Sequence, residues 1–361
     1  MQIFIFGMGP GETAQGAALA RVALAAGHQV TMAVRQPQTL RILDTLKCPQ
    51  TVLRDGAAVR DAIEQGGYDA VVFCNAKAFG DDPAFQNTPP TPKPFTCSLD
   101  SNWLFDHPTW YPCIQWLDQI FLSFSGAIYR RGLREGGGHY EIPVRLQPKI
   151  KPVGFIPSRQ PLEPSVRAGI RHELGLPEAH RLIFSYFGRG PTYQRHFFPR
   201  YRQIMAACHD ACGGALRVIH LGEEQPQAPW VLCEEKDLDR SRFYDWLAAS
   251  DLVFQHHGLS TLMQAIGAGV PAMTNIYHPR PGCRHAHAWE IGPFEKAGLC
   301  TIHFYDDPLD RIVDTLHALL FPSARRTAMI QAQQRHLVAG EENALAEIVR
   351  LASRRDGGPK K

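Results

Sequence analysis

The sequence lacks a long apolar run and has little net charge. Of its 361 residues 20% are charged, and 38 Lys and Arg face 35 Asp and Glu, a net charge of +3. No stretch approaches the roughly 20 apolar residues that a transmembrane helix needs, and so small a charge does not indicate nucleic acid as a partner. The N-terminal residues Gln2–Phe6 have no basic leader and run directly into glycine, unlike a signal peptide. We therefore expect a cytoplasmic protein.

The cysteines also lack a recognisable pattern. Nine of them, an odd number, are scattered and mostly in apolar surroundings, which is typical of reduced core thiols. One group could suggest a metal site: Cys283, His285 and His287, with His278 upstream. The side chains of Cys283, His285 and His287 would point to the same side only if this segment were extended. No Cys-x-x-Cys or His-x-x-x-His pair accompanies it. We therefore predict no metal site.

The length is typical of two domains. The segment 156–164 contains Pro157, Pro161 and Pro164 among polar neighbours, which favours a stiff linker. Before it, the alternation of apolar runs and helical spacing predicts a βαβ opening: strand Ile3–Phe6, a glycine turn, helix Thr13–Ala26 and strand Val30–Val34. After the linker a second βα series begins at strand Leu182–Phe187. We therefore predict an α/β protein.

The first turn also permits a dinucleotide-binding interpretation. Gly7 and Gly9 begin a Gly-x-Gly-x-x-Gly pattern, but Glu12 replaces its third glycine. The acidic residue expected after the second strand, where it would bind ribose, is missing, and Arg35 lies there instead. These departures disfavour NAD, whereas an arginine suits the extra phosphate of NADP. A Rossmann protein that binds NADP stays a minor alternative.

The most informative stretch is 251–271, DLVFQHHGLSTLMQAIGAGVP. It predicts a buried strand at Leu252–Phe254, a turn at His256–Thr261 and a helix at Leu262–Ala268. A strand followed by a turn of small residues and a helix N-terminus directs several backbone N–H groups and the positive end of the helix dipole at one point, which suits phosphate. The alternative is an ordinary helix start capped by Ser260 or Thr261.

The spacing from His256 through Gly258 and Ser260-Thr261 to Gly269-Val270-Pro271 resembles the donor-binding signature of GT-B glycosyltransferases, particularly the UDP-glycosyltransferase and MurG-like groups. The resemblance implies an α/β GT-B fold, with two Rossmann-like domains facing across a cleft. Residues 1–155 would form the acceptor domain and 156–338 the donor domain, and 339–361 would be a helix that returns to the N-terminal domain, followed by a basic tail.

The same resemblance implies an activity. The protein would transfer a sugar from a nucleoside diphosphate sugar, of UDP or dTDP type, to a hydroxyl or amine of a small-molecule or glycan acceptor. The reaction would be inverting and would use neither a metal nor a resident cofactor. Neither the acceptor nor the oligomeric state follows from the sequence.

The resemblance also assigns donor contacts. Gly188 and Arg189 follow a strand where relatives place a loop under the phosphates, and Arg189 would add positive charge. Gln264 replaces a Glu that receives the ribose hydroxyls in many relatives, and Arg284 aligns with a pair that binds the sugar. The predicted donor-binding residues are Gly188, Arg189, His256, His257, Gly258, Ser260, Thr261, Gln264 and Arg284.

Catalytic and acceptor residues are expected in the first domain. Glu12 lies where the family's base would be and could accept the proton of an attacking hydroxyl; it is equally an acidic residue favoured in a helix's first turn. Asp100 could orient or replace that base. The resemblance places the acceptor pocket in the proline- and aromatic-rich segment 79–112, with Trp103 and Asp106 as contacts, and Gly11 of the first turn is a further expected contact. Such a segment also suits a stiff loop with buried aromatics.

Two further functions stay open. On the same fold, a nucleotide-sugar hydrolase or epimerase would need no separate sugar acceptor. A non-catalytic nucleotide-sugar-binding helper protein is a third possibility, motivated by the departures from the family pattern at Glu12, Gln264 and Cys283-Arg284.

Overall fold

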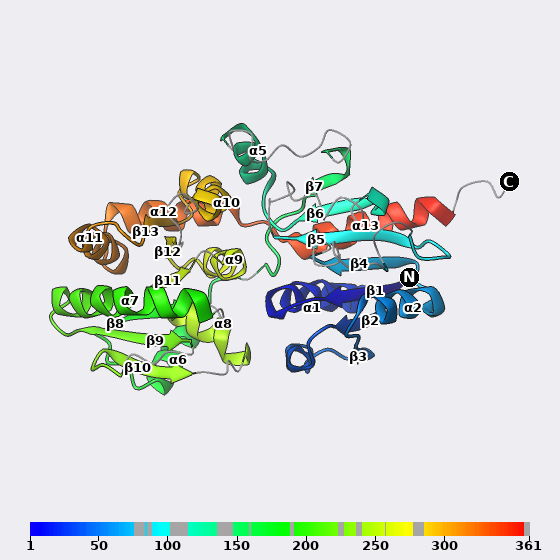
Figure 1. Ribbon diagram of the computed structural model, residues 1–361. Helices are drawn as coiled ribbons and strands as arrows, with labels where there is room; N and C mark the ends of the chain where they lie inside the picture. Colours follow the sequence, from blue (N-terminus) through cyan, green and yellow to red (C-terminus); the bar gives the residue numbers. More distant parts are fainter. Residues whose placement is uncertain are drawn as a thin grey trace. The chain divides into compact units, whose positions relative to one another are not determined.

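The computed structural model describes residues 1–75, 84, 89–101, 115–135, 147–158, 160–187, 191–222, 227–235, 240–256, 258–276 and 285–356 (Figure 1). The chain divides into two compact units. Unit 1 comprises Met1–Ser158 together with Val338–Lys361, and unit 2 comprises Arg159–Leu337.

Unit 1 is built on a parallel sheet with the strand order β3-β2-β1-β4-β5-β6-β7. Central strands such as β4 are buried along their whole length, as expected when helices cover both faces of a parallel sheet. The strands are β1 (Gln2–Gly7), β2 (Gln29–Val34), β3 (Gln50–Val52), β4 (Ala70–Cys74), β5 (Phe95–Asp100), β6 (Gln119–Leu122) and β7 (Ile150–Pro152).

The helices of unit 1 connect these strands and close its core. Helix α13, from the far end of the chain, packs against α1, and both contribute to one apolar cluster with the sheet. The side chain of Asn343 donates to the Val153 carbonyl at 2.8 Å, which ties α13 to the end of β7. The helical elements are α1 (Pro10–Ala25), η1 (Pro37–Ile42), α2 (Gly56–Gly66), α5 (Gly126–Glu135), η4 (Gln147–Lys149) and α13 (Gly340–Asp356).

Unit 2 repeats the plan with the strand order β10-β9-β8-β11-β12-β13, again all parallel. Its core on one sheet face is aromatic: Phe187 and Tyr201 lie against Phe254 of the central strand. Trp230 is 3% exposed beside Tyr201 and belongs to this core. The strands are β8 (Arg181–Tyr186), β9 (Leu216–Leu221), β10 (Val231–Glu235), β11 (Leu252–His256), β12 (Ala272–Ile276) and β13 (Thr301–Phe304).

Seven helices are described in unit 2, and Figure 1 shows them arranged around its sheet. They are α6 (Pro164–Glu173), α7 (Pro191–Ala211), α8 (Arg240–Ala249), α9 (Leu259–Ala268), α10 (His285–Lys296), α11 (Leu309–Leu320) and α12 (Ala324–His336). Among the described helices of both units, none combines the length and the hydropathy that crossing a membrane requires.

Each sheet reverses its strand order once, between β1 and β4 in unit 1 and between β8 and β11 in unit 2. This arrangement is that of a Rossmann-like domain, and it confirms the predicted α/β class with two such domains. In open parallel sheets, ligands bind outside the carboxyl ends of the strands at the reversal. The fold therefore selects two positions in advance, the ends of β1 and β4 and the ends of β8 and β11.

One prediction about the first turn is wrong. Helix α1 begins at Pro10 rather than Thr13, with Gly9 as its N-cap, so that Glu12 lies within the first helical turn. The physical reason is that proline at the first helical position needs no N–H partner and already has a helical φ. Helices α2 and α5 and strand β7 were not predicted from the sequence.

A buried carboxylate fixes the start of β11. Asp251 is 3% exposed, and its carboxylate accepts the Leu182 N–H at 2.8 Å. The guanidinium groups of Arg167 and Arg171 on α6 donate to the same carboxylate at 2.8 and 3.1 Å. Arg326 of α12 donates to the Asp251 carbonyl at 2.7 Å. Asp251 thus joins β8, α6 and α12 to β11, the strand with which the 251–271 motif begins.

We expect Asp251→Ala to lower the free energy of unfolding by about 3 kcal/mol, because it removes a buried anion from two partly buried arginines and leaves the buried Leu182 N–H without its acceptor. Urea titration of the full chain measures this change. The matched control is Asp314→Ala, at an exposed position of α11, for which a change within about 0.5 kcal/mol is expected. Equal effects of the two substitutions would contradict the assigned role of Asp251.

Candidate functional site

The 251–271 motif folds as strand β11, a short turn and helix α9. Residues Leu252–Gln255 are buried, and His256, the last residue of the strand, is partly exposed. Gly258 is the N-cap of α9, and its carbonyl accepts the Leu262 N–H at 3.2 Å. No side chain of the described residues caps this helix, so the expected alternative of a cap by Ser260 or Thr261 is not what the structure has. The N–H groups of the first turn are therefore available to an anion.

The turn is shaped by a close approach between His256 and Gly258. A Cβ atom at position 258 would lie only 2.9 Å from Cε1 of the His256 ring, so a larger residue here would require the ring or the backbone to shift. The His256 ring lies edge-on to Tyr186 with 5.6 Å between ring centroids. Its Nδ1 is 3.3 Å from the Tyr186 carbonyl, which can only accept, so Nδ1 carries the hydrogen. The ring is thus held at the reversal between β8 and β11.

Polar side chains beneath the turn support it. Gln255 is fully buried, and its Nε2 lies 3.3 Å from the Gly258 carbonyl and 3.4 Å from Thr274 Oγ1 on β12. On the same strand Asn275 Nδ2 lies 3.1 Å from His303 Nε2, and His303 Nδ1 donates to the Phe304 carbonyl at 3.2 Å. Gln255 therefore holds the N-cap carbonyl from below, whereas the Asn275–His303 pair lies on the opposite face of β12 and joins β12 to β13.

Burial sets the charge of His303. Desolvation lowers the pKa of this histidine to about 4, although its bond to the Phe304 carbonyl and the charge of Asp307 act in the opposite direction. His303 is therefore neutral near pH 7, and its unprotonated Nε2 accepts from Asn275. A neutral ring at this position preserves the bond from Asn275, because a protonated Nε2 could not accept it.

Helix α9 carries the other described donor-binding predictions. Thr261 is 4% exposed and packs inward, whereas Ser260 and Gln264 are partly exposed. Ser260 and Gln264 are four residues apart, so they lie on the same face of the helix. The structure thus brings His256, Gly258, Ser260, Thr261 and Gln264 together at the end of β11 and the first turns of α9.

Four predicted donor contacts lie outside the described residues: Gly188, Arg189, His257 and Arg284. Gly188 and Arg189 nevertheless follow β8 closely, and Tyr186, the last residue of that strand, contacts His256. Sequence reasoning missed Tyr186. Its place at the end of a predicted strand, directly before a Phe-Gly sequence, is the signal that would have found it.

In unit 1 the reversal between β1 and β4 holds Glu12. A Cβ atom at position 9 would lie 2.8 Å from Glu12 Oε2, so the carboxylate lies back over the N-cap of α1. Its other oxygen is 3.4 Å from Nδ2 of Asn75, which follows β4 with a left-handed φ of 71°. Gly11 lies in the same helical turn. Sequence analysis did not identify Asn75, although a polar residue directly after a buried strand is a usual sign of a site.

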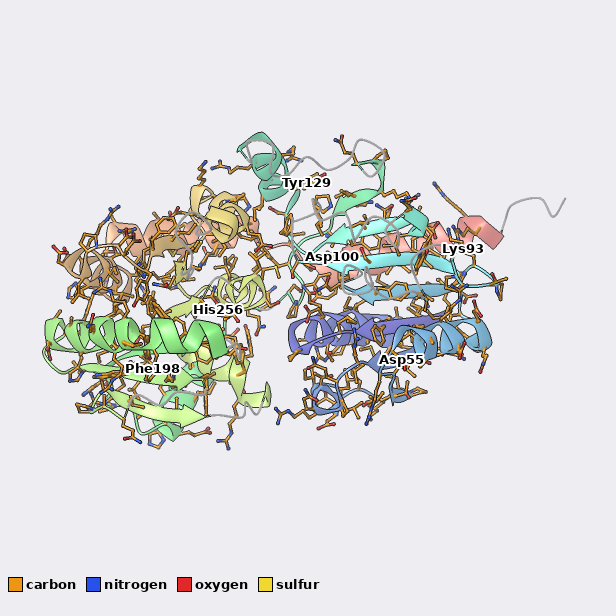
Figure 2. All side chains as sticks on the ribbon, viewed as in Figure 1. Asp55, Lys93, Asp100, Tyr129, Phe198 and His256 are labelled. Atoms are coloured by element: carbon orange, nitrogen blue, oxygen red, sulfur yellow. The ribbon has the colours of Figure 1, made fainter. Side chains whose placement is uncertain are left out.

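The second predicted catalytic residue belongs to the same edge. Asp100 is the last residue of β5, the strand beside β4, and is 2% exposed (Figure 2). It accepts a hydrogen bond from Ser98 Oγ at 2.7 Å. Burial raises the pKa of the Cys74 thiol at the end of β4, and the charges of Glu12 and Asp100 raise it further. The charges of Glu12 and Asp100 therefore both reach the Cys74 thiol at the carboxyl edge of the sheet. The predicted acceptor contacts Trp103 and Asp106 lie outside the described residues.

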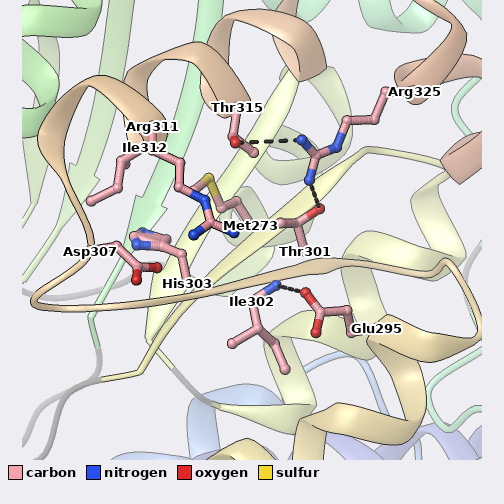
Figure 3. Close-up of a pocket in the computed structure, with 10 residues that line it drawn as sticks. All are labelled: Met273, Glu295, Thr301, Ile302, His303, Asp307, Arg311, Ile312, Thr315 and Arg325. Atoms are coloured by element: carbon pink, nitrogen blue, oxygen red, sulfur yellow. Dashed lines mark hydrogen bonds between the residues drawn. The ribbon is translucent and has the colours of Figure 1, made fainter.

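A cavity of about 140 Å³ opens beside the edge strand β13 (Figure 3). Glu295 and Asp307 line it and accept the outward N–H groups of Ile302 at 2.6 Å and Phe304 at 2.9 Å. These bonds cap an edge that would otherwise offer free donors to another chain. Arg325 spans Thr301 and Thr315 along the wall. We interpret the cavity as part of the edge's protection.

A metal site was not predicted, and the described ranges contain no group of three or more His, Cys, Asp or Glu that could hold one. His285 begins helix α10, so the extended backbone that would align Cys283, His285 and His287 is absent from residue 285 onward. Cys283 and His278 themselves lie outside the described residues.

The pKa of His303 predicts a pH-dependent stability. Because the folded pKa of about 4 is below the ordinary 6.5, the unfolded chain binds more protons between these values, and stability falls as pH decreases from 6.5 to 4. The full difference corresponds to roughly 3 kcal/mol. We expect His303→Gln to flatten this part of the profile in urea titrations at several pH values. His172→Gln, at an exposed position of α6, is the control and should leave the profile unchanged; an unaltered slope in His303→Gln would refute the assignment.

The comparisons with known proteins identify the fold. No protein-family model matches the sequence, and no curated protein does. A solved structure of a Listeria monocytogenes protein assigned as a UDP-N-acetylglucosamine 2-epimerase is 14% identical, with a TM-score of 0.71, and the match covers 100% of this chain and 98% of that one. The S. aureus MnaA structure with UDP is 11% identical, with a TM-score of 0.69 and coverage of 97% and 96%.

The glycosyltransferase SnogD from Streptomyces nogalater is 15% identical, with a TM-score of 0.61 and coverage of 98% and 99%. Likeness at such low identity shows the fold alone. The resemblance to GT-B proteins expected from the sequence is thereby confirmed as a structural match. The chain has the GT-B architecture of two Rossmann-like domains, a fold shared by glycosyltransferases and by the structure assigned as a 2-epimerase.

Proposed function

We propose that this protein binds a nucleoside diphosphate sugar at the turn between β11 and α9 and transfers its sugar to a hydroxyl or amine acceptor. One observation carries the proposal: α9 begins at the carboxyl end of β11, beside the strand reversal, with a glycine N-cap and no side-chain cap among the described residues. Reversal points bind ligands in open parallel sheets, and uncapped helix N-termini bind phosphate.

The diphosphate would receive the N–H groups of Leu259, Ser260 and Thr261, which precede the first intrahelical bond of α9. Fixed donors of this kind stabilise the charge that develops on a departing diphosphate without reorganising. The Gln255 amide fixes the Gly258 carbonyl from below, so the donors are held before the ligand arrives. Gly188, Arg189, His257 and Arg284 remain proposed donor contacts by their position in the sequence motif, as does Gln264 for the ribose. The S. aureus MnaA structure contains UDP, which supports a nucleoside diphosphate as the ligand proposed here.

For the acceptor half, we propose that unit 1 binds the acceptor and that Glu12 removes its proton. The acceptor oxygen or nitrogen would attack the anomeric carbon as the bond to the diphosphate oxygen breaks, and a carboxylate within hydrogen-bond reach would take the proton. Asn75 is the positioning residue, because its Nδ2 lies 3.4 Å from Glu12 Oε1. Asp100 is the alternative base, and Gly11, Trp103 and Asp106 remain proposed acceptor contacts.

The position of Glu12 also bears on the NADP alternative. A dinucleotide would place its pyrophosphate at the N-terminus of α1. The Glu12 carboxylate already lies over Gly9, the N-cap of that helix. Like charges repel there, so the structure disfavours a pyrophosphate at β1 and favours the second unit as the nucleotide-binding one.

An epimerase or hydrolase acting on a nucleotide sugar is the second candidate. The extent of the fold match to the structure assigned as a UDP-N-acetylglucosamine 2-epimerase supports it. The same donor turn serves both reactions, and they differ in what attacks or isomerises the sugar. A non-catalytic helper protein would bind the same ligand and convert nothing.

Binding at the donor turn can be tested with Gly258→Ala. The new methyl group would meet the His256 ring at 2.9 Å and displace it or the helix N-terminus, so the increase in melting temperature caused by UDP or dTDP should disappear. Gly169→Ala is the matched control, since no atom lies within 4 Å of a Cβ at that helical position. Thermal-shift titration of both variants and the wild type decides the matter. If no nucleoside diphosphate stabilises the wild type, the donor-site proposal fails.

The role of Glu12 can be tested with Glu12→Gln. We expect turnover of UDP-glucose or UDP-N-acetylglucosamine to fall by about 100-fold or more, with UDP binding retained, because the amide cannot accept the proton. Glu342→Gln, at an exposed position of α13, should behave as the wild type.

Product analysis with and without an added sugar or alcohol acceptor separates the candidates. Acceptor-dependent release of UDP supports transfer, free sugar or an epimer without acceptor supports the second candidate, and no conversion at all supports the helper protein. Full turnover in Glu12→Gln would remove this residue from the mechanism.

A further inference from the structure

Two cysteines lie together at the C-terminal end of α7. The Cys212 N–H donates to the Cys208 carbonyl at 3.0 Å, so the two residues are one helical turn apart and their side chains share a face. Cys208 is fully buried, and Cys212 is partly buried at the margin of the unit 2 core. One thiol of the pair is therefore accessible, and the other lies beneath it.

The surroundings of Cys212 favour its thiolate. The Cys208 S–H donates to the Cys212 sulfur, and this bond together with the charge of Arg181 lowers the pKa of Cys212 despite its partial burial. The backbone places Arg181 at this position: its N–H donates to the Ala215 carbonyl at 2.8 Å, and it pairs with Leu216. Arg217 donates to the Gly214 carbonyl at 3.0 Å in the same turn.

Three arginines share one carboxylate near this edge of unit 2. Arg181 lies 4.0 Å from Asp251, whose single carboxylate also receives Arg167 and Arg171. A partly exposed thiol near a guanidinium group is a setting in which cysteines become reactive. The negative C-terminal end of the α7 dipole disfavours a thiolate at Cys212. The charge of Arg181 and the bond from Cys208 favour the thiolate and offset the dipole.

The other described cysteines differ from Cys212. Cys48 is also partly buried, but desolvation raises its pKa. Cys74, Cys97 and Cys300 are buried, and burial raises the pKa of each. Among the six cysteines that the structure describes in full, accessibility and a stabilised thiolate coincide at Cys212.

We propose that Cys212 and Cys208 form a thiol-modification site, in which Cys212 is the nucleophile, Cys208 the resolving thiol, and a small-molecule disulfide such as oxidised glutathione the substrate. The site lies beside Arg181 and Leu216, which begin β8 and β9. It is therefore at the amino edge of the sheet whose carboxyl edge carries His256, and it is independent of the proposed sugar transfer.

The chemistry proceeds in two exchanges. The Cys212 thiolate attacks one sulfur of the disulfide, forming a mixed disulfide and releasing one glutathione thiolate. Cys208 then loses its proton to solvent and attacks the Cys212 sulfur, which forms the Cys208–Cys212 disulfide and releases the second glutathione. Oxidised glutathione is reduced by two electrons, and the cysteine pair is oxidised by two. Residues four apart on a helix have Cα atoms about 6 Å apart, within the roughly 4.4–6.8 Å that a disulfide spans, but their Cβ atoms are about 5–6 Å apart and must approach to roughly 4 Å. The bond therefore requires the chain to shift at Cys212, which directly follows the last residue of α7.

The test is competitive alkylation of the native full-length protein with limiting iodoacetamide, read by peptide mass spectrometry. Cys48 is the control within the same molecule, because it matches Cys212 in partial burial but has no thiol partner. We expect Cys212 to react at least about tenfold faster than Cys48 near neutral pH, since the thiolate is the reacting form. Equal or slower reaction at Cys212 would overturn the proposal.

Two variants test the assigned parts. Cys208→Ser keeps a hydrogen-bond donor of similar size and should retain fast alkylation of Cys212, whereas Cys208→Ala should lose it; circular dichroism confirms that both fold. With oxidised glutathione, the wild type should yield a Cys208–Cys212 disulfide two hydrogens lighter than the dithiol, and Cys208→Ser should stop at the Cys212 mixed disulfide. Cys212→Ser should leave Cys208 unmodified. A mixed disulfide that persists at Cys212 in the wild type would refute Cys208 as the resolving thiol.

Discussion

A parallel sheet places the carboxyl ends of all its strands at one edge, and this constraint decides where the polar side chains of each unit can meet. Glu12, Asn75 and Asp100 follow or end β1, β4 and β5, which are neighbours in the first sheet. In the second sheet, Tyr186 and His256 end β8 and β11. Residues far apart in the sequence converge because the strand order reverses at these places, and the reversal leaves room for a ligand.

The convergence would be of little use without a rigid support. Buried polar groups are costly unless they are hydrogen-bonded, and unit 2 uses them at both ends of β11. Asp251 binds the amino end to α6, β8 and α12, and Gln255 binds the carboxyl end to the N-cap of α9. The strand is thus fixed in position along its axis. Helix α9 follows this strand directly, so the N–H groups of its first turn keep a constant geometry.

Local chemistry explains how much of this was predictable. The motif at 251–271 was recognisable because glycine, small residues and a Gly-Val-Pro ending mark a strand, a turn and a helix at fixed spacing. The N-cap was foreseeable only in outline: a serine or threonine cap was the alternative until the structure placed Gly258 there.

The partners of Gln255 and Asn275 were not predictable, because strand pairing brings them together across 19 and 28 residues of chain. For the same reason Asn75 was missed beside Glu12. The first turn was misjudged by three residues, since a proline after two glycines indicates a loop as readily as a first helical position.

The two units begin their helices at the reversal in opposite ways, and this difference argues for a division of tasks. Helix α1 has its own carboxylate, Glu12, lying over its glycine N-cap. Helix α9 also starts from glycine, but its first turn contains no acidic residue and none of the described side chains caps it. A carboxylate that already lies at a helix N-terminus repels a further anion there, whereas an uncapped N-terminus attracts one. The carboxylate at α1 and the uncapped N-terminus of α9 therefore support the proposal that an anionic donor binds unit 2 and that Glu12 of unit 1 serves in proton transfer.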